Sequence, residues 1–98
     1  MVPEVVIDNK AKSQLIKLYK YIRKDSLQNA DMVKSKILES IMSLSVKWEQ
    51  HPPDKYRKIW NENFRAYEIL KYRITYHLID NKILVTRIRH TKMSPLKY

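Results

Sequence analysis

The stretch on either side of Asp80 and Asn81 carries the pattern that most restricts how this chain can fold. Two segments rich in β-branched and aromatic residues, Tyr72–Ile79 and Ile83–Ile88, flank that pair. Such segments favour strands, and Asp and Asn tolerate the left-handed backbone of a two-residue hairpin turn. The chain contains no glycine, so we expect Asn and Asp to serve wherever φ is positive. The pattern therefore predicts an antiparallel hairpin.

This turn decides which side chains share a face of the sheet. A two-residue loop pairs Ile79 with Lys82, and the later pairs keep that register. One face then holds Tyr72, Ile74, Tyr76 and Leu78 opposite Arg89, Arg87, Val85 and Ile83. We expect Ile74, Tyr76, Val85 and Ile83 to be buried under helices. The other face holds Lys71, Arg73, Thr75 and His77 opposite His90, Ile88, Thr86 and Leu84.

The second face of this hairpin has two interpretations. It is either the solvated side of an antiparallel sheet or a functional basic surface. We favour the basic surface, because cations and imidazoles gather at the end of the hairpin far from its turn; they are Lys71, Arg73, Arg87, Arg89, His90 and Lys92.

The net charge of +10 is concentrated in the second half of the chain. Residues 51–98 carry 11 Lys and Arg against 4 Asp and Glu, which accounts for +7 of the total. A positive field of this size on fewer than 100 residues favours nucleic acid or an acidic protein as a partner.

Length and composition limit the remaining possibilities. We expect residues 1–98 to form one domain with one modest core. No apolar run approaches the roughly 18 residues of a membrane span, and the N-terminus does not read as a secretory signal. The chain has no cysteine, so a disulfide framework is excluded and a reducing cytoplasm is the simplest setting.

The first half of the chain reads as a strand followed by two helices. Val5–Ile7 predicts a short strand, and Asp8 or Asn9 can cap the helix after it. The first helix carries an apolar stripe of Ala11, Leu15, Leu18, Tyr19 and Ile22, and we expect Tyr19 and Tyr21 in the core or at its edge. Asp25-Ser26 offers a second cap, for a helix from about Leu27 to Glu49.

Together these elements predict an α+β fold with the order β-α-α-β-β-β. Another strand precedes the hairpin, so three antiparallel strands follow the helices, and the first strand joins them beside a later one. A helical hairpin packs on one face of this small, mainly antiparallel sheet.

Few kinds of catalysis suit these residues. His51, His77 and His90 lack the spacing of metal ligands, and the absence of glycine excludes the usual phosphate-binding loops. Metal-free RNA cleavage needs only a base, an acid and cations beside the phosphate. Arg73, Arg87 and Arg89 are candidate cations, His90 or His77 a candidate acid, and Glu68 or Glu62 a candidate base.

Four segments together resemble the RelE/ParE superfamily, toxins of bacterial type II toxin–antitoxin systems that are often labelled plasmid stabilisation proteins. They are LIKLYKYIRKDSLQNA, RAYEILKYRITYHLID, ILVTRIRH and HTKMSP. The run Tyr72 to Tyr76 and the pair Arg89-His90, with Lys92 and Pro95, are the most telling. The resemblance covers nearly the whole chain.

The resemblance implies a growth-inhibiting toxin that a cognate antitoxin holds inactive, with no cofactor. RelE-like members cut mRNA on the ribosome, whereas ParE-like members inhibit DNA gyrase without a catalytic site. We lean to the ParE-like branch, because active ribonucleases usually end their last strand with a catalytic Tyr or His close to the C-terminus. Here the strand leads into His-Thr-Lys-Met-Ser-Pro, which resembles a ParE-type ending, and Tyr98 lies eight positions beyond His90. A non-toxic nucleic-acid-binding domain is a further alternative.

The resemblance also assigns roles to particular residues. Arg73 resembles the sheet arginine that the ribonucleases place near the scissile phosphate, and a ribonuclease would use Arg73, His90 and Glu68 in catalysis. Basic residues of the loop after the second helix lie where those members often keep cations. The set expected to bind the target or nucleic acid is Lys55, Arg57, Lys58, Arg65, Lys71, Arg87, Arg89 and Lys92.

Overall fold

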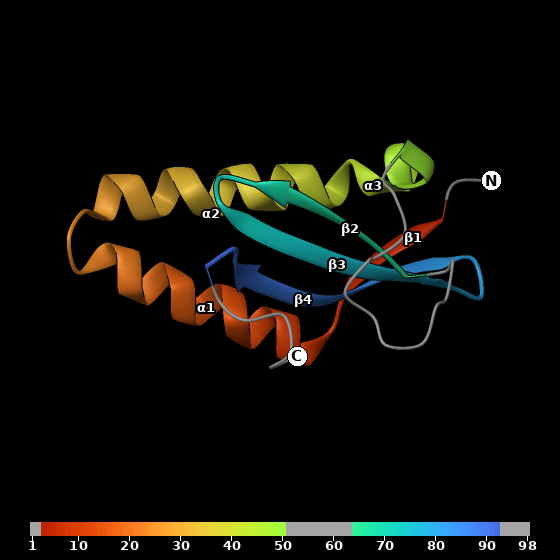
Figure 1. Ribbon diagram of the computed structural model, residues 1–98, viewed down its shortest axis with the longest axis horizontal. Helices are drawn as coiled ribbons and strands as arrows, with labels where there is room; N and C mark the ends of the chain where they lie inside the picture. Colours follow the sequence, from red (N-terminus) through yellow and green to blue (C-terminus); the bar gives the residue numbers. More distant parts are fainter. Residues whose placement is uncertain (1–2, 51–63, 93–98) are drawn as a thin grey trace.

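The computed structural model describes residues 3–50 and 64–92, which form a helical layer on a four-stranded sheet (Figure 1). The elements, in chain order, are β1 (Glu4–Ile7), α1 (Asn9–Arg23), α2 (Leu27–Met42), α3 (Leu44–Lys47), the 3-10 helix η1 (Trp48–Gln50), β2 (Phe64–Ile69), β3 (Tyr72–Ile79) and β4 (Lys82–His90). The predicted order β-α-α-β-β-β and the α+β class are confirmed.

The sheet has the strand order β1-β4-β3-β2. β1 is parallel to β4, and the other neighbours are antiparallel. Asp80 and Asn81, with φ of 49° and 58°, make the predicted two-residue turn between Ile79 and Lys82. The first strand therefore joins the sheet beside the last one.

Both long helices begin at the predicted caps. The Asp8 side chain accepts from Lys10 N at 2.7 Å, and the Ser26 side chain accepts from Asn29 N at 3.0 Å. Each cap satisfies a backbone donor that the helix itself leaves without a partner. α1 and α2 then run antiparallel, as Figure 1 shows.

The second helix is shorter than predicted, because it ends at Met42 instead of continuing to Glu49. Serine hydroxyls donate to carbonyls three residues earlier at the break: Ser40 to Ile37, Ser43 to Ser40, and Ser45 to Met42. Such bonds compete with the helical ladder. The chain therefore continues as the short α3 and η1.

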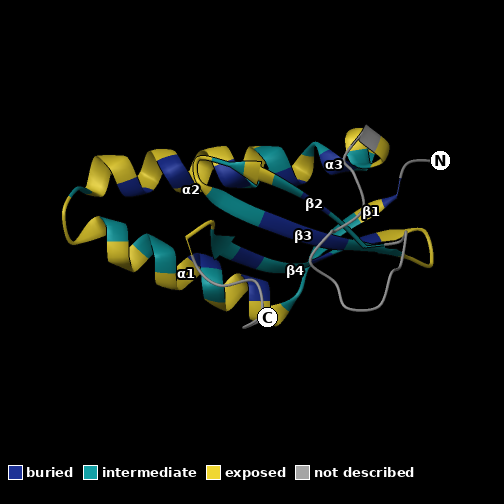
Figure 2. Ribbon diagram, viewed as in Figure 1, coloured by how far each residue is buried: buried dark blue, intermediate teal, exposed yellow. Residues whose placement is uncertain are grey.

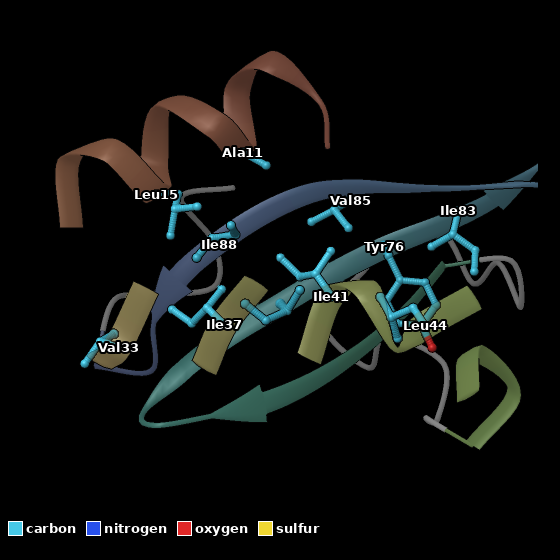
Figure 3. Close-up of a cluster of buried hydrophobic side chains, with 11 residues drawn as sticks. Ala11, Leu15, Val33, Ile37, Ile41, Leu44, Tyr76, Ile83, Val85 and Ile88 are labelled. Carbon is cyan, nitrogen blue, oxygen red and sulfur yellow. The ribbon is translucent and has the colours of Figure 1, made fainter. Parts of the chain in front are cut away.

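The core lies between the helices and one face of the sheet. Ile74, Tyr76, Ile83 and Val85 are fully buried, as predicted. α2 turns its buried residues toward the sheet and exposes its outer side (Figure 2). Figure 3 shows the helical side chains that meet the strands, which include Leu15, Val33, Ile37, Ile41 and Leu44.

The predicted face assignment fails in the second half of β4, because that strand contains a β-bulge. Tyr76 pairs with Val85, but Thr75 pairs with Arg87, so Thr86 is an extra residue. Beyond it every β4 side chain changes face relative to the uninterrupted register. Ile88, predicted outside, is 2% exposed in the core opposite Ile74.

The bulge also corrects the positions of the basic residues. Arg87 and Arg89, predicted on the helix-facing side, lie on the open face with Arg73, and His90 moves to the helix side opposite Tyr72. The physical reason is the cost of burying a charge. An uninterrupted register would have placed two guanidinium groups against the apolar core.

The turn between β2 and β3 contradicts the expectation that Asn and Asp serve every position with positive φ. Leu70 and Lys71 occupy it with φ of 50° and 69°. Lys71 therefore lies in a turn and not on a strand face. Side chains with a Cβ are disfavoured in this region, so the sheet holds the turn in place against a local cost.

Hydrogen bonds between described residues tie the sheet to the helical layer. The Tyr67 and Ser40 hydroxyls lie 2.8 Å apart, and the Tyr76 hydroxyl donates to the Trp48 carbonyl at 2.5 Å. Ile88 N donates to the side-chain oxygen of Gln14 at 2.7 Å. Burial raises the pKa of Tyr67 to about 12, against the opposing effect of its bond to Ser40. Both phenols therefore stay neutral and bonded at ordinary pH.

Candidate functional site

An arginine row, which we define as Arg73, Arg87 and Arg89, occupies the face of the sheet away from the helices. Arg73 lies on β3 directly opposite Arg89 on β4, and Arg87 lies opposite Thr75. Like charges on directly opposite residues repel each other, and guanidinium groups hold anions such as carboxylates and phosphates. The row therefore favours an anionic group.

Glu68 supplies one carboxylate to this row. It lies on β2 opposite Arg73, and its Oε2 is 3.7 Å from Arg73 Nη1. The Glu68 side chain is 59% exposed, whereas that of Arg73 is 12% exposed. The Glu68 carboxylate therefore pairs with one guanidinium group of the row.

A groove of about 770 Å³ lies between α1, the first residue of β3 and the last residues of β4. Its walls consist of Gln14, Lys17, Leu18, Tyr21, Tyr72, Ile88, Arg89, His90 and Lys92. The charged residues among these are all cations. We call this feature the α1–β4 groove.

His90 and Tyr72 line the groove from β4 and β3. Their rings meet edge to face with centroids 5.2 Å apart, and Lys92 N donates to His90 Nδ1 at 3.1 Å. Burial, and next the nearby Tyr21, raise the pKa of Tyr72. The two tyrosines therefore reach the same part of the groove from α1 and β3.

The structure brings only part of the predicted site together. Arg73, Arg87, Arg89 and Glu68 share the open face, whereas His90 lies on the helix side of the sheet. His77, the other candidate acid, stacks on Phe64 at 4.0 Å on the open face, further along β3.

Other predicted residues lie apart from the row. The Arg65 guanidinium lies 5.4 Å from the Trp48 ring centroid, near η1. Lys71 and Lys92 are exposed, Lys71 in the β2–β3 turn and Lys92 after β4. Lys55, Arg57, Lys58 and Glu62 lie outside the described residues.

The α1 wall of the groove was not predicted as a site. Gln14, Lys17, Leu18 and Tyr21 recur at helical spacing on one side of α1. Tyr21, expected in or beside the core, is 71% exposed. The spacing was a usable signal, but only the tertiary fold shows that this side of α1 faces the end of β4.

Within the described residues there is neither a metal-binding cluster nor a membrane-spanning helix. These residues contain no group of three or more His, Asp or Glu side chains placed to hold a metal ion. Across residues 3–50 and 64–92, no helix is long and apolar enough to cross a membrane.

Comparison with known proteins identifies relatives. Residues 5–95 match the family model described as ParE toxin of type II toxin–antitoxin system, parDE. No curated protein sequence matches the chain.

Solved structures that share its fold include two toxin–antitoxin systems. One is titled as the chromosomal ParDE toxin–antitoxin system from P. aeruginosa, with a TM-score of 0.74, 16% identity, and coverage of 93% of this chain and 98% of that one. The other is titled as the toxin–antitoxin complex RelBE2 from Mycobacterium tuberculosis, with a TM-score of 0.69, 17% identity, and coverage of 92% and 99%.

Proposed function

This chain belongs to the family of ParE toxins of type II toxin–antitoxin systems, and from that premise we propose that it arrests bacterial growth by inhibiting DNA gyrase. On this proposal the toxin acts by binding, without a chemical step. The family assignment favours a toxin over a non-toxic nucleic-acid-binding domain.

One observation carries the choice of mechanism. Metal-free RNA cleavage needs a cation at the phosphate and a general acid at the leaving oxygen, within hydrogen-bond reach of one substrate. Arg73 and His90 project from opposite faces of the sheet, and Glu68 is engaged by Arg73. The candidate catalytic residues therefore do not converge on a single phosphate, which supports inhibition by binding.

A RelE-like ribosome-dependent mRNA endoribonuclease is the second candidate. The arginine row favours it, because three guanidinium groups on neighbouring strands suit a phosphodiester backbone. On this alternative Arg73 contacts the scissile phosphate.

The proposed regulator is a cognate antitoxin with an acidic and partly apolar segment. The net charge of +10 and the cations at the end of the sheet suit such a segment, which covers the basic end of the sheet and part of the helix surface. Segments of this kind commonly fold on binding. Charge pairing then raises the association rate more than the final affinity.

The test is induction in a bacterial host, followed by two measurements on the same culture. DNA supercoiling and gyrase–DNA cleavage products report on gyrase, and mapped transcript ends report on RNA cleavage. We expect growth arrest with altered supercoiling and no new transcript ends. New ends within coding regions, with supercoiling unchanged, would replace this mechanism with the RelE-like one.

A further inference from the structure

α1 presents a row of lysines on the side away from its buried residues. Ala11 and Leu15 are buried in the core, and Leu18 and Ile22 pack against it. Residues 10, 13, 17, 20 and 24 follow each other in steps of three and four, so they share the other side of the helix. All five are exposed. We call the basic members of this row the lysine stripe; they are Lys10, Lys17, Lys20 and Lys24.

The two long helices of the same layer differ in charge. From residue 9 to residue 24 the chain carries five Lys, one Arg and no Asp or Glu. α2 is balanced, with two acidic residues against two lysines: Asp31, Glu39, Lys34 and Lys36. Asp31 is also engaged across the helix pair, because the Tyr19 hydroxyl donates to its Oδ1 at 2.6 Å. The excess of positive charge in this helix pair therefore belongs to α1.

The lysine stripe carries a local electrostatic cost. Lys17 and Lys20 are three residues apart, Lys20 and Lys24 are four apart, and like charges at such spacings repel each other on a helix. Lys10 lies in the first turn, which contains no acidic residue, and a cation there opposes the helix dipole. A solvated helix face avoids these costs by mixing signs, as α2 does. A polyanion laid along the stripe relieves them.

The residue types of the stripe select a phosphate backbone. Lysine ammonium groups bind phosphates as point charges, whereas base edges are read mainly by bidentate side chains such as Arg, Asn and Gln. Single strands are held by stacking on aromatic side chains, but Tyr21, the exposed aromatic residue of α1, lines the α1–β4 groove. The stripe extends about 21 Å at roughly 1.5 Å per residue. A straight row of this length suits duplex DNA, which carries one charge per roughly 1.7 Å of its axis.

We propose that the lysine stripe of α1 binds the phosphate backbone of duplex DNA without regard to sequence, and so anchors the toxin to the DNA that gyrase holds. The second part of this inference rests on the proposed function, because gyrase supplies the duplex. The stripe places the DNA contact on the helical layer, away from the arginine row on the open face of the sheet.

The experiment measures binding of the full chain to a fluorescent duplex of about 20 base pairs by anisotropy across a salt series. Lys10→Gln/Lys20→Gln should weaken binding by about tenfold. It should also make the slope of log affinity against log salt shallower by about two, because each lysine on a phosphate releases about one counterion. These two lysines do not line the groove. They lie in the first and last turns of α1, so their effects on the helix dipole oppose each other.

Lys36→Gln/Lys47→Gln is the matched control, because it removes the same charge elsewhere. Lys36 lies one turn before Ser40, which bonds to Tyr67 of β2, and Lys47 is exposed on α3. This pair should weaken binding by about twofold at most, since distant charges are screened. Lys10→Arg/Lys20→Arg keeps the charge and should bind as the wild type does. Equal losses in the two glutamine pairs would overturn the proposal, because binding would then follow net charge alone.

Other polyanions test the choice of ligand. The probes are single-stranded DNA of the same length, polyglutamate, and vesicles containing phosphatidylglycerol. If one of them binds more tightly than the duplex and loses affinity in Lys10→Gln/Lys20→Gln, the stripe belongs to that ligand and the proposal fails. A duplex of unrelated sequence should bind equally well. A preference of more than about tenfold between duplexes would contradict recognition of the backbone alone.

Supercoiling by purified gyrase separates this inference from the proposed function. We expect inhibition by the wild type and by Lys36→Gln/Lys47→Gln. The stripe variant Lys10→Gln/Lys20→Gln should inhibit less, by about the factor that it loses in DNA binding. Undiminished inhibition by the stripe variant overturns this inference alone. Duplex binding through the stripe by a chain that leaves gyrase active overturns the proposed function alone.

Discussion

Arg73 and Arg89 lie directly opposite each other on β3 and β4, on the face of the sheet that the helices leave open. The extra residue Thr86 makes this pairing possible, because it moves Arg89 out of the helix-facing layer and Ile88 into it. One inserted residue therefore completes both the core and the arginine row.

The bulge predicts unequal costs for two similar truncations in β4. Ile88→Ala should lower the free energy of unfolding by about 2–5 kcal/mol, because it opens a cavity in the core. Leu84→Ala is the matched control, since Leu84 lies on the open face opposite His77 and is only half-buried. Urea denaturation of both variants checks this. Equal costs would indicate the uninterrupted register, in which Ile88 and Leu84 share the open face.

The β2–β3 turn predicts a stabilising substitution. Lys71→Gly should raise the free energy of unfolding by about 1 kcal/mol, because glycine accepts the positive φ of 69° that a Cβ disfavours. Lys82→Gly, in β4, should instead destabilise the protein, since glycine gains nothing in an extended strand. Thermal unfolding of the two variants distinguishes them. A loss of stability in Lys71→Gly would show that the turn carries no strain.

Tyr67 predicts a loss of stability in alkali. Its pKa rises from 10.0 to about 12 on folding, so the unfolded chain releases this proton first. The contribution of this shift to the free energy of unfolding is on the order of 2 kcal/mol. It is fully present below about pH 10 and disappears as pH rises toward 12. Tyr67→Phe should flatten that part of the stability curve, measured by urea denaturation between pH 8 and 12. A Tyr67→Phe curve that keeps the full alkaline loss of the wild type would contradict the assignment.

Capture of the antitoxin should depend on salt. The association rate should fall as ionic strength rises, because long-range attraction by the +10 charge is screened. The dissociation rate should change much less. Stopped-flow measurements with the purified partner across a salt series test this, and a flat association rate would exclude electrostatic steering.

Local patterns predicted much of this fold. Asp8 and Ser26 cap the helices as expected, and Asp80-Asn81 forms the hairpin turn. The alternation of apolar residues also predicts the burial of Ile74, Tyr76, Ile83 and Val85. The bulge left a trace in the sequence, because Ile83 and Val85 are two residues apart whereas Ile88 follows after three. Strict alternation along the strand ignores this change of spacing and places Ile88 on the wrong face.

The parts that sequence reasoning missed depend on tertiary context. Leu70 and Lys71 give no local signal for positive φ, since the flanking strands impose it. The α1–β4 groove brings together Tyr21 and His90, which are far apart in the chain. Their meeting depends on where β1 ends and α1 crosses the edge of β4, and no spacing within either segment encodes that.

The measurement that tests the central claim most directly is growth arrest by the wild type, Arg73→Ala, His90→Ala and a truncation after Lys92, with transcript ends mapped in each. A ribonuclease should lose about 10²–10³ in rate without Arg73 and roughly 10²–10⁴ without a general acid at His90. A gyrase inhibitor should lose only the binding free energy of one or two contacts in either point variant. Truncation after Lys92 should weaken its binding at least as much. We predict arrest that persists in both point variants without new transcript ends. Arrest abolished by either one, with 2′,3′-cyclic phosphate ends in the wild type, would contradict inhibition by binding.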